Sequence, residues 1–97
     1  MKDWKFHQPR NTAVIADKFF AEGKETCVYV THDAYDNGWQ FLTANTNGDE
    51  RRAVVLALST VVELDPTLDE LADLPPGWYA TRQSEHESWS LYEKIKK

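Results

Sequence analysis

The 97-residue chain is poor in cysteine, with Cys27 as its single thiol. One cysteine excludes an internal disulfide framework and a thiolate-rich zinc site. Residues 26–30 read Thr-Cys-Val-Tyr-Val, a composition typical of a strand. A reactive thiolate needs an electropositive, partly open environment, whereas the nearby charged residues, Glu25 and Asp33, are acidic. We therefore expect a buried, unreactive thiol.

Long apolar runs and catalytic motifs are also missing from the sequence. No stretch approaches the roughly 18 apolar residues of a membrane-spanning helix, and the N-terminus lacks the apolar core of a secretory signal. We therefore expect a cytoplasmic protein without a membrane partner. The sequence contains no nucleophile elbow, Gly-rich phosphate loop or zinc-ligand spacing. These absences favour a protein that is not an enzyme and that carries no cofactor or metal.

Positive charge is scarce in the second half of the chain. The net charge is −5, which argues against a nucleic-acid partner, because phosphate binding depends on clustered Lys and Arg. No Lys or Arg occurs in residues 53–81. The acidic residues of this segment are Glu63, Asp65, Asp69, Glu70 and Asp73. They predict either a surface that attracts a basic protein partner or the solvated face of a helix.

The pattern of apolar residues predicts one small domain. Residues 1–10 are expected to form an N-terminal arm or edge strand, residues 11–93 a single α+β domain, and residues 94–97 a basic tail. Strands are expected at residues 12–15, 26–32, 38–43, 54–58, 77–83 and 88–94, the last two joined as an antiparallel hairpin. Residues 16–23 fit either a helical turn or a continued strand, and Ser59 fits the N-cap of a short helix that ends at residue 64.

The clearest helix signal begins at Asp65. This residue fits the N-cap position, Pro66 fits the first helical position, and Thr67 with Glu70 has the spacing of a capping box. A core-facing stripe at helical spacing comprises Leu68, Leu71 and Ala72. Together the elements predict an α+β fold, with an antiparallel or mixed sheet of about five to six strands and one or two helices packed on one face.

The stretch THDAYDNGWQ is the strongest candidate for a site. His32, Asp33 and Asp36 are residue types that bind metal ions or perform acid–base chemistry. On a continued strand, however, His32 and Asp33 point to opposite faces of the sheet. Asp36 followed by Asn37 and Gly38 is strong turn chemistry, since Asn and Gly tolerate positive φ. The turn of a β-hairpin is therefore the favoured interpretation.

Aromatic residues supply the other candidates. Trp39, Trp78 and Trp89 each lie beside a Gly or Ser in a short extended segment. They fit either a ligand groove or, more commonly, a core in which the indole N–H bonds to the backbone. The next candidates for an exposed functional surface are Tyr79, Arg82 and Tyr92.

Several short motifs occur in the order found in one family of small bacterial proteins. They are the acidic turn Asp36-Asn37-Gly38-Trp39-Gln40-Phe41, the triplet Gly48-Asp49-Glu50, the apolar stretch 58–66 that ends in Asp-Pro, and the tail LADLPPGWYATRQSEHESW. The chain resembles immunity-protein-33-like proteins over roughly residues 13–89. The resemblance implies a single α+β domain and, for some relatives, the neutralisation of a toxin.

Three functional hypotheses follow. The leading one is a non-enzymatic binding protein, such as a toxin-neutralising immunity protein, that presents the acidic segment 63–73 to a basic toxin or another protein. The alternative is a small-ligand or metal-binding domain centred on His32, Asp36 and the tryptophans. A third is self-association through an exposed edge such as residues 4–6. The sequence leaves a monomer and a homodimer equally open.

Overall fold

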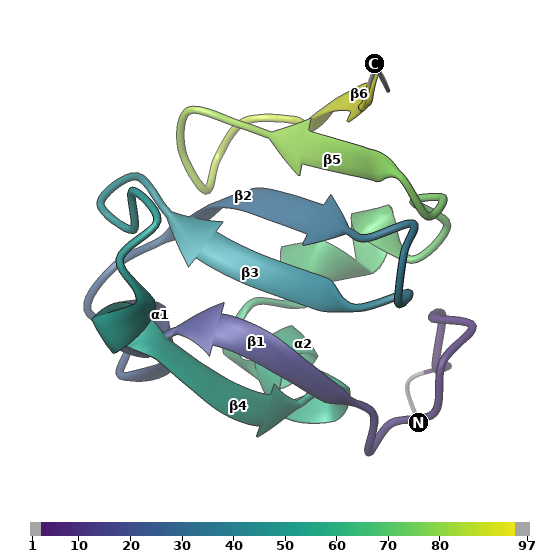
Figure 1. Cartoon of the computed structure of the whole chain (residues 1–97), viewed down its shortest axis with the longest axis horizontal. Helices are drawn as coiled ribbons and strands as arrows, with labels where there is room; N and C mark the ends of the chain where they lie inside the picture. Colours follow the sequence, from purple (N-terminus) through teal and green to yellow (C-terminus); the bar gives the residue numbers. More distant parts are fainter. Residues whose placement is uncertain (1–2, 95–97) are drawn as a thin grey trace.

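The computed structural model describes residues 3–94 and has the predicted α+β fold. Residues 1–2 of the expected arm and residues 95–97 of the expected basic tail lie outside the described residues. Six strands form one mixed sheet in the order β4-β1-β3-β2-β5-β6 (Figure 1). Its strands are β1 (Ala13–Asp17), β2 (Cys27–His32), β3 (Trp39–Thr43), β4 (Ala53–Ala57), β5 (Trp78–Thr81) and β6 (Ser90–Glu93). β1 runs parallel to β3, and the remaining neighbours are antiparallel.

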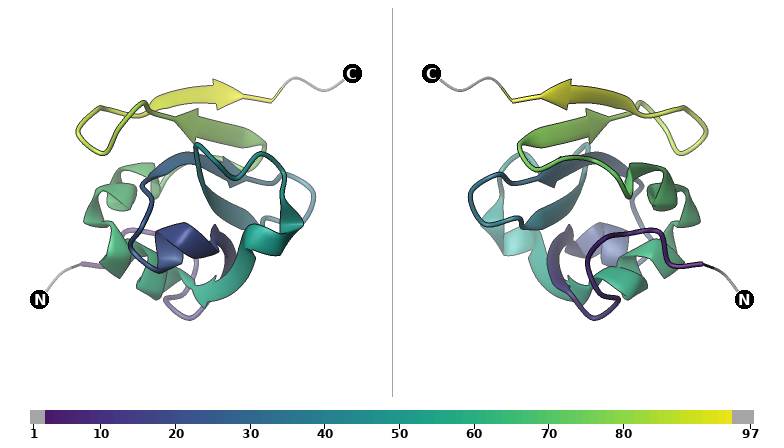
Figure 2. Two further views of the ribbon diagram at one scale, coloured as in Figure 1. Left: turned by 90° about the vertical axis from the view of Figure 1, so that its left-hand side faces the viewer. Right: turned by 90° about the vertical axis from the view of Figure 1, so that its right-hand side faces the viewer.

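The main helical layer covers one face of the sheet. It consists of α2 (Leu58–Leu64) and the 3-10 helix η2 (Pro66–Leu71), and the side views show both on the same side of the strands (Figure 2). The single turn α1 (Lys18–Ala21) buries Phe20 in the same core. The 3-10 turn η1 (Glu50–Arg52) lies on the other side of the sheet. Among the described residues, no helix is long and apolar enough to cross a membrane.

Turn chemistry explains why the strands reverse where they do. Asn37 has φ of 60°, and β2 and β3 pair in antiparallel register on either side of it, as predicted. Asn47 and Gly48 also have positive φ, at 45° and 73°, in the turn that leads to η1. At Gly77 φ is 89°, a value that side chains disfavour, and β5 begins at the next residue.

The helical segment after β4 confirms some capping predictions and corrects others. The Asp65 carboxylate accepts a hydrogen bond from the Thr67 N–H, and Pro66 follows at the first position, as predicted. The helix that begins there is 3-10 rather than α. The prediction that Ser59 caps α2 is wrong, because Ala57 is the N-cap and makes no side-chain bond. Thr67 forms no capping box, since its hydroxyl donates to Asp65 and accepts from Arg82.

The core lies between the sheet and the helical layer. Alternate residues of the strands point into it, and Leu68, Leu71 and Ala72 face it from η2 as predicted. The expectation of an edge strand in the arm is wrong for residues 3–10, which are irregular. Phe6 is buried there and Trp4 packs against the core, so this segment closes one end of the interior. Burial of two aromatic rings outweighs the weak strand pattern of so short a segment.

Candidate functional site

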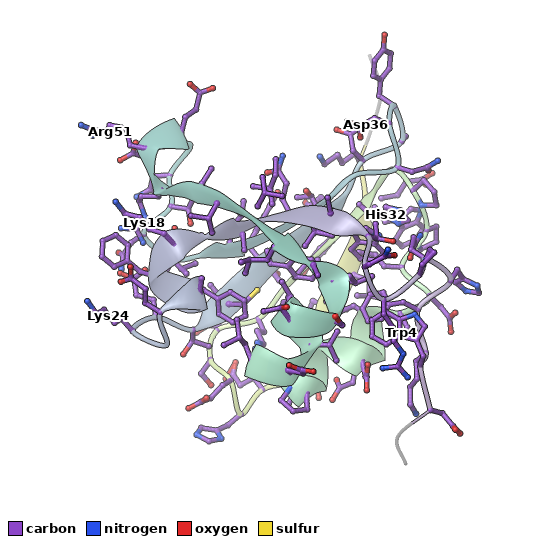
Figure 3. All side chains as sticks on the ribbon, turned by 90° about the horizontal axis from the view of Figure 1, so that it is seen from below. Trp4, Lys18, Lys24, His32, Asp36 and Arg51 are labelled. Carbon is purple, nitrogen blue, oxygen red and sulfur yellow. The ribbon has the colours of Figure 1, made fainter. Side chains whose placement is uncertain are left out.

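His32 is part of the core rather than of a polar site. It ends β2, is 3% exposed, and stacks on Trp39 with ring centroids 4.0 Å apart. Its Nδ1 lies 2.7 Å from the carbonyl oxygen of Leu74. A carbonyl only accepts, so Nδ1 carries the proton and donates it. In Figure 3, His32 and Trp4 lie at the same end of the molecule, where the arm meets the sheet.

The two carboxylates near His32 bond to the backbone of their own loop. Asp33 accepts from the Tyr35 N–H at 2.7 Å, and Asp36 accepts from the Gly38 N–H at 2.8 Å. Such side-chain bonds stabilise tight turns, so the turn interpretation is confirmed. His32 and these carboxylates do not converge on a common point. Across residues 3–94, no cluster of three His, Cys, Asp or Glu side chains has the geometry to hold a metal ion.

The tryptophans are core residues, as favoured, but not all of their indole N–H groups bond to the backbone as predicted. Trp39 is 2% exposed, while Trp4, Trp78 and Trp89 are partly buried against the core. The Trp4 indole donates to the backbone carbonyl of Gln8 at 2.7 Å. The indole nitrogens of Trp39 and Trp89 have no hydrogen-bond partner among the described residues. Their stabilisation therefore comes from ring packing.

Arg82 is buried, so the prediction of an exposed functional residue is wrong. Its guanidinium donates to the Cys27 carbonyl from Nε and Nη2, at 3.0 and 2.9 Å, and to the Asp65 carboxylate at 2.6 Å. It also lies 4.2 Å from the centre of the Trp89 ring. Strand alternation explains this position, because Ala80 points inward and Arg82 is two residues further on. The group joins β2, the start of η2 and the β5–β6 hairpin.

The acidic segment divides between internal and exposed roles. Asp65 pairs with Arg82, so it is not free to contact a partner. Asp73 is exposed and lies 2.7 Å from Nε2 of His7. Glu63 and Asp69 line a cleft of about 340 Å³ between the arm and the helical layer. Glu70 is exposed on η2. The exposed acidic surface is therefore formed by Glu63, Glu70 and Asp73, together with the half-buried Asp69, on the helical side of the molecule.

A second ionic cluster, which the sequence did not predict, lies at the end of β1. The Asp17 side chain is fully buried and accepts from Arg52 Nε and from the Thr46 hydroxyl, both at 2.7 Å. Arg52 also donates to Glu25, whose carboxylate accepts from the Thr43 hydroxyl. The cluster joins β1, the segment before β2, the end of β3 and η1. These residues are far apart in sequence, so no local spacing signals the contact.

Hydrogen bonds lower the pKa of both carboxyl groups in this cluster. Burial by itself would raise the pKa of Asp17, but donation from Arg52, Thr46 and the Phe19 N–H outweighs it and holds that pKa below 3.8. The Thr43 hydroxyl is the main cause of the lowered pKa of Glu25, which burial opposes and Arg52 reinforces. Both carboxyl groups are therefore ionised at neutral pH.

We expect this cluster to make stability fall in acid. A carboxyl group with a lowered folded pKa binds protons more readily in the unfolded state, so its contribution is present above the unfolded pKa and is lost as pH falls through the folded pKa. The midpoint of urea unfolding should therefore drop below about pH 4. Asp17→Asn should be less stable at pH 7, and its deficit should shrink toward pH 2. A constant deficit across this range would contradict the ionised pair.

A cleft of about 590 Å³ lies between the α1–β2 loop, the start of η2 and the β5–β6 loop. Cys27 is at its base, but burial raises the pKa of this thiol to about 12. The thiol is therefore protonated at neutral pH, as the expectation of an unreactive cysteine requires. The carboxylates of Glu25 and Asp65, which line the same cleft, pair with Arg52 and Arg82. These contacts are structural.

Among residues 3–94, no helical layer covers the sheet face opposite α2 and η2 over much of its area (Figure 2). Successive register pairs place one residue of each strand in a row across it: Val55, Ile15, Gln40, Thr31, Tyr79 and Tyr92. Tyr29 and Leu42 also pair with each other and lie on the same face, because Tyr29 is two residues from Thr31 and Leu42 is two residues from Gln40. We call these eight residues the open face. Val55 is 69% exposed, Tyr92 48% and Ile15 38%, which is unusual for large apolar side chains in such an arrangement.

Three tyrosines form a stack at the β6 end of the open face. Tyr29 and Tyr79 have ring centroids 5.5 Å apart, and Tyr79 and Tyr92 are 5.4 Å apart. Burial, with a smaller effect of the neighbouring Tyr79, raises the pKa of Tyr29. Stacking fixes the ring orientations, so the stack presents a preformed apolar surface with hydroxyl groups.

Loops border the open face and make it uneven. The loop 44–49 separates two hollows of about 380 and 330 Å³, and Leu42, Thr46 and Gly48 line both of them. Tyr29 lines the first hollow and Ile15 the second. Asp36 and Arg51 mark the two loops at opposite ends of the sheet, on the side away from α2 (Figure 3). The sequence carried a signal for this face, because apolar residues occupy positions that alternate with the core residues of β1, β4 and β5.

Comparisons with protein-family models, with curated proteins and with solved structures give no match for this chain.

Proposed function

We propose that this chain is a non-enzymatic protein-binding domain and that the open face is its main contact surface. The single observation that carries the proposal is the open face, to which each of the six strands contributes an aliphatic or tyrosine side chain. A sheet face without a covering layer leaves apolar area in water, and a partner removes that area on binding. Tyrosines are among the residues that most often dominate binding energy.

The charged groups inside the fold and the cysteine thiol support binding rather than catalysis. Arg82, Asp65, Asp17 and Arg52 are engaged in internal ion pairs, and the Cys27 thiol is protonated at neutral pH. Catalysis needs a nucleophile, acid or base that can reach a substrate. The open face offers stacked rings, aliphatic groups and hydroxyls, which are the chemistry of a protein interface.

The resemblance to immunity-protein-33-like proteins gives this proposal a particular form, in which the partner is a toxin. An acidic chain suits a basic partner, since opposite net charges speed association. The test is co-expression with the product of a neighbouring toxin gene. If the chain neutralises the toxin, the wild type should restore growth of the toxin-expressing cells, and the double variant Tyr79→Ala/Tyr92→Ala should not. Restored growth with the double variant would oppose a role for the open face.

The exposed acidic surface of the helical layer is the second candidate for the contact. It is supported by the exposed carboxylates of Glu63, Glu70 and Asp73 and by the absence of Lys and Arg from residues 53–81. This surface lies on the side of the sheet opposite the open face. Because the two surfaces are far around the molecule from each other, substitutions can separate their roles.

Site-specific photo-cross-linking tests which surface meets the partner. A photoreactive phenylalanine analogue at Tyr92 samples the open face, and the same analogue at Thr60 samples the exposed side of α2. We expect a defined cross-linked protein from the Tyr92 position and none from Thr60. Tyr79→Ala in the same background should abolish the product. Cross-linking from Thr60 alone would favour the helical surface instead.

A further inference from the structure

Within residues 3–94, the edge strand β4 carries none of the features that usually prevent an exposed strand from pairing with another chain. β4 is the five-residue strand Ala-Val-Val-Leu-Ala and contains no charge and no proline. Soluble proteins usually block such an edge with lysine, proline, a bulge or a covering segment. In Figure 1, β4 forms one edge of the sheet, and no element of the described chain lies alongside it.

The hydrogen-bond pattern identifies which backbone groups of β4 point outward. The Leu58 N–H donates to the Thr12 carbonyl at 2.8 Å, and this pair continues the register in which Val14 faces Leu56. Bonded and non-bonded pairs alternate in an antiparallel ladder. The backbone groups of Ala53, Val55 and Ala57 are therefore directed away from β1.

Some of these outward groups are already satisfied within the chain. The Ala53 N–H donates to the Glu50 carbonyl as the C-cap of η1. Ala57 is the N-cap of α2, so its carbonyl accepts the first bond of that helix. The groups that remain for an external strand are the Ala53 carbonyl, the Val55 N–H and carbonyl, and the Ala57 N–H.

We propose that β4 pairs with β4 of a second copy of this chain, antiparallel and with the two-fold axis at Val55. In this register Val55 exchanges both of its bonds with Val55 of the second copy. The Ala57 N–H of each copy donates to the Ala53 carbonyl of the other. Each backbone group of β4 that points outward and is unsatisfied within the chain then has a hydrogen-bond partner in the second copy. The two outward groups that are already bonded within the chain are the Ala53 N–H and the Ala57 carbonyl, and in this register they face each other.

The side chains are self-complementary in the same register. Residues of similar size and polarity meet in this register: Ala53 faces Ala57, Val54 faces Leu56, and Val55 faces itself. Each facing pair occurs twice about the two-fold axis, as in any isologous contact, and no like charges meet across the pair. The Val55 side chains, 69% exposed in one copy, come together on the open face. The pairing therefore joins two open faces into one continuous surface.

A strand of five residues is about 17 Å long, so the contact buries less than the roughly 800 Å² per partner of a standard interface. We therefore expect a reversible dimer. Sedimentation velocity from about 1 µM to about 1 mM spans the range in which such small interfaces dissociate. The wild type should shift from monomer to dimer over this range. A monomer throughout would overturn the proposal and leave an extended segment of another protein as the occupant of the edge.

Two variants separate strand pairing from other modes of association. Val55→Lys places two ammonium groups together at the axis, and Ala57→Pro removes an outward N–H at a residue whose φ, −72°, proline adopts without strain. Both should be monomeric at the concentrations where the wild type is dimeric, with the circular dichroism spectrum of the wild type. A dimer that persists in either variant would overturn the proposed pairing.

Ile15→Lys is the matched control for charge. It lies directly opposite Val55 on the same face but on the inner strand β1. Its dimer should be as strong as that of the wild type. If Ile15→Lys dissociates the dimer as fully as Val55→Lys, the contact is made by the open face rather than by the β4 edge, which would contradict the inference.

Discussion

Trp39→Ala should lose about 3–5 kcal/mol of unfolding free energy, the usual cost of truncating a buried tryptophan. The ring packs against Phe6 edge-on at 5.4 Å, stacks on His32 at 4.0 Å and lies parallel to Phe41 at 5.9 Å between centroids. Its removal leaves a cavity between the arm and the sheet. For a domain of this size we expect the melting temperature to fall by about 12–40 °C.

Trp39→Phe is the informative control for this prediction. Phenylalanine keeps most of the ring contacts and removes an indole N–H that has no hydrogen-bond partner among the described residues. Its cost should be less than half that of alanine, measured by urea unfolding. If Trp39→Ala changed stability by less than about 1 kcal/mol, as surface substitutions do, Trp39 could not be the centre of the core.

Arg82→Ala should also cost about 3–5 kcal/mol, because removal of one member of a buried ion pair leaves the other charge without compensation. The Asp65 carboxylate would lose its guanidinium, and the Cys27 carbonyl would lose both of its donated bonds. Urea unfolding measures the loss. Arg82→Lys should recover only part of the stability, since one ammonium group cannot replace the planar fork of donors.

Arg51→Ala provides the comparison for Arg82. Arg51 pairs with Asp49, but its side chain is 89% exposed, so the unfolding midpoint should not change. Comparison of the two variants also shows whether Arg82 stabilises the fold or contacts a partner. A stable Arg82→Ala protein that had lost only partner binding would contradict the buried role described above.

Local chemistry explains which parts of the fold could be predicted from the sequence. Asp36, Asn37 and Gly38 determine a turn through their own backbone preferences, and Asp65 with Pro66 determines a helix start. Residue periodicity likewise located the strands and the face of η2 that enters the core. These features depend on neighbours within a few positions, so a single sequence contains the necessary information.

The long-range contacts could not be predicted in the same way. Asp17 and Arg52 are 35 positions apart, and Asp65 and Arg82 are 17 apart. The pairing of β1 with β4 sets Asp17 opposite Ala53, next to Arg52, and the packing of the helical layer on the sheet brings Asp65 to Arg82. Consequently, the sequence marked Asp65 and Arg82 as candidates for an exposed surface, whereas the fold pairs them inside.

The open face was predicted only in part, because Tyr79 and Tyr92 were candidates for an exposed functional surface but its aliphatic members were not. Its residues were recognised as strand residues, but a strand pattern does not show which face a helical layer covers. In β1, Val14 and Ala16 face the helices, and Ile15 lies between them on the uncovered side. The same alternation sets Val55 apart from Val54 and Leu56 on β4. Which side of each strand stays uncovered becomes visible only once the layers are assembled.

The affinity for the cross-linked partner, measured by titration calorimetry at low and physiological salt, decides between the two surfaces. Tyrosine hot spots contribute about 2 kcal/mol or more each, so Tyr79→Ala/Tyr92→Ala should weaken binding at least about 100-fold at both salt concentrations. Charge reversal of Glu63 and Glu70 should change affinity only a few-fold, and mainly at low salt. The opposite pattern, with intact binding by the tyrosine variant and loss on charge reversal, would show that the partner binds the helical layer.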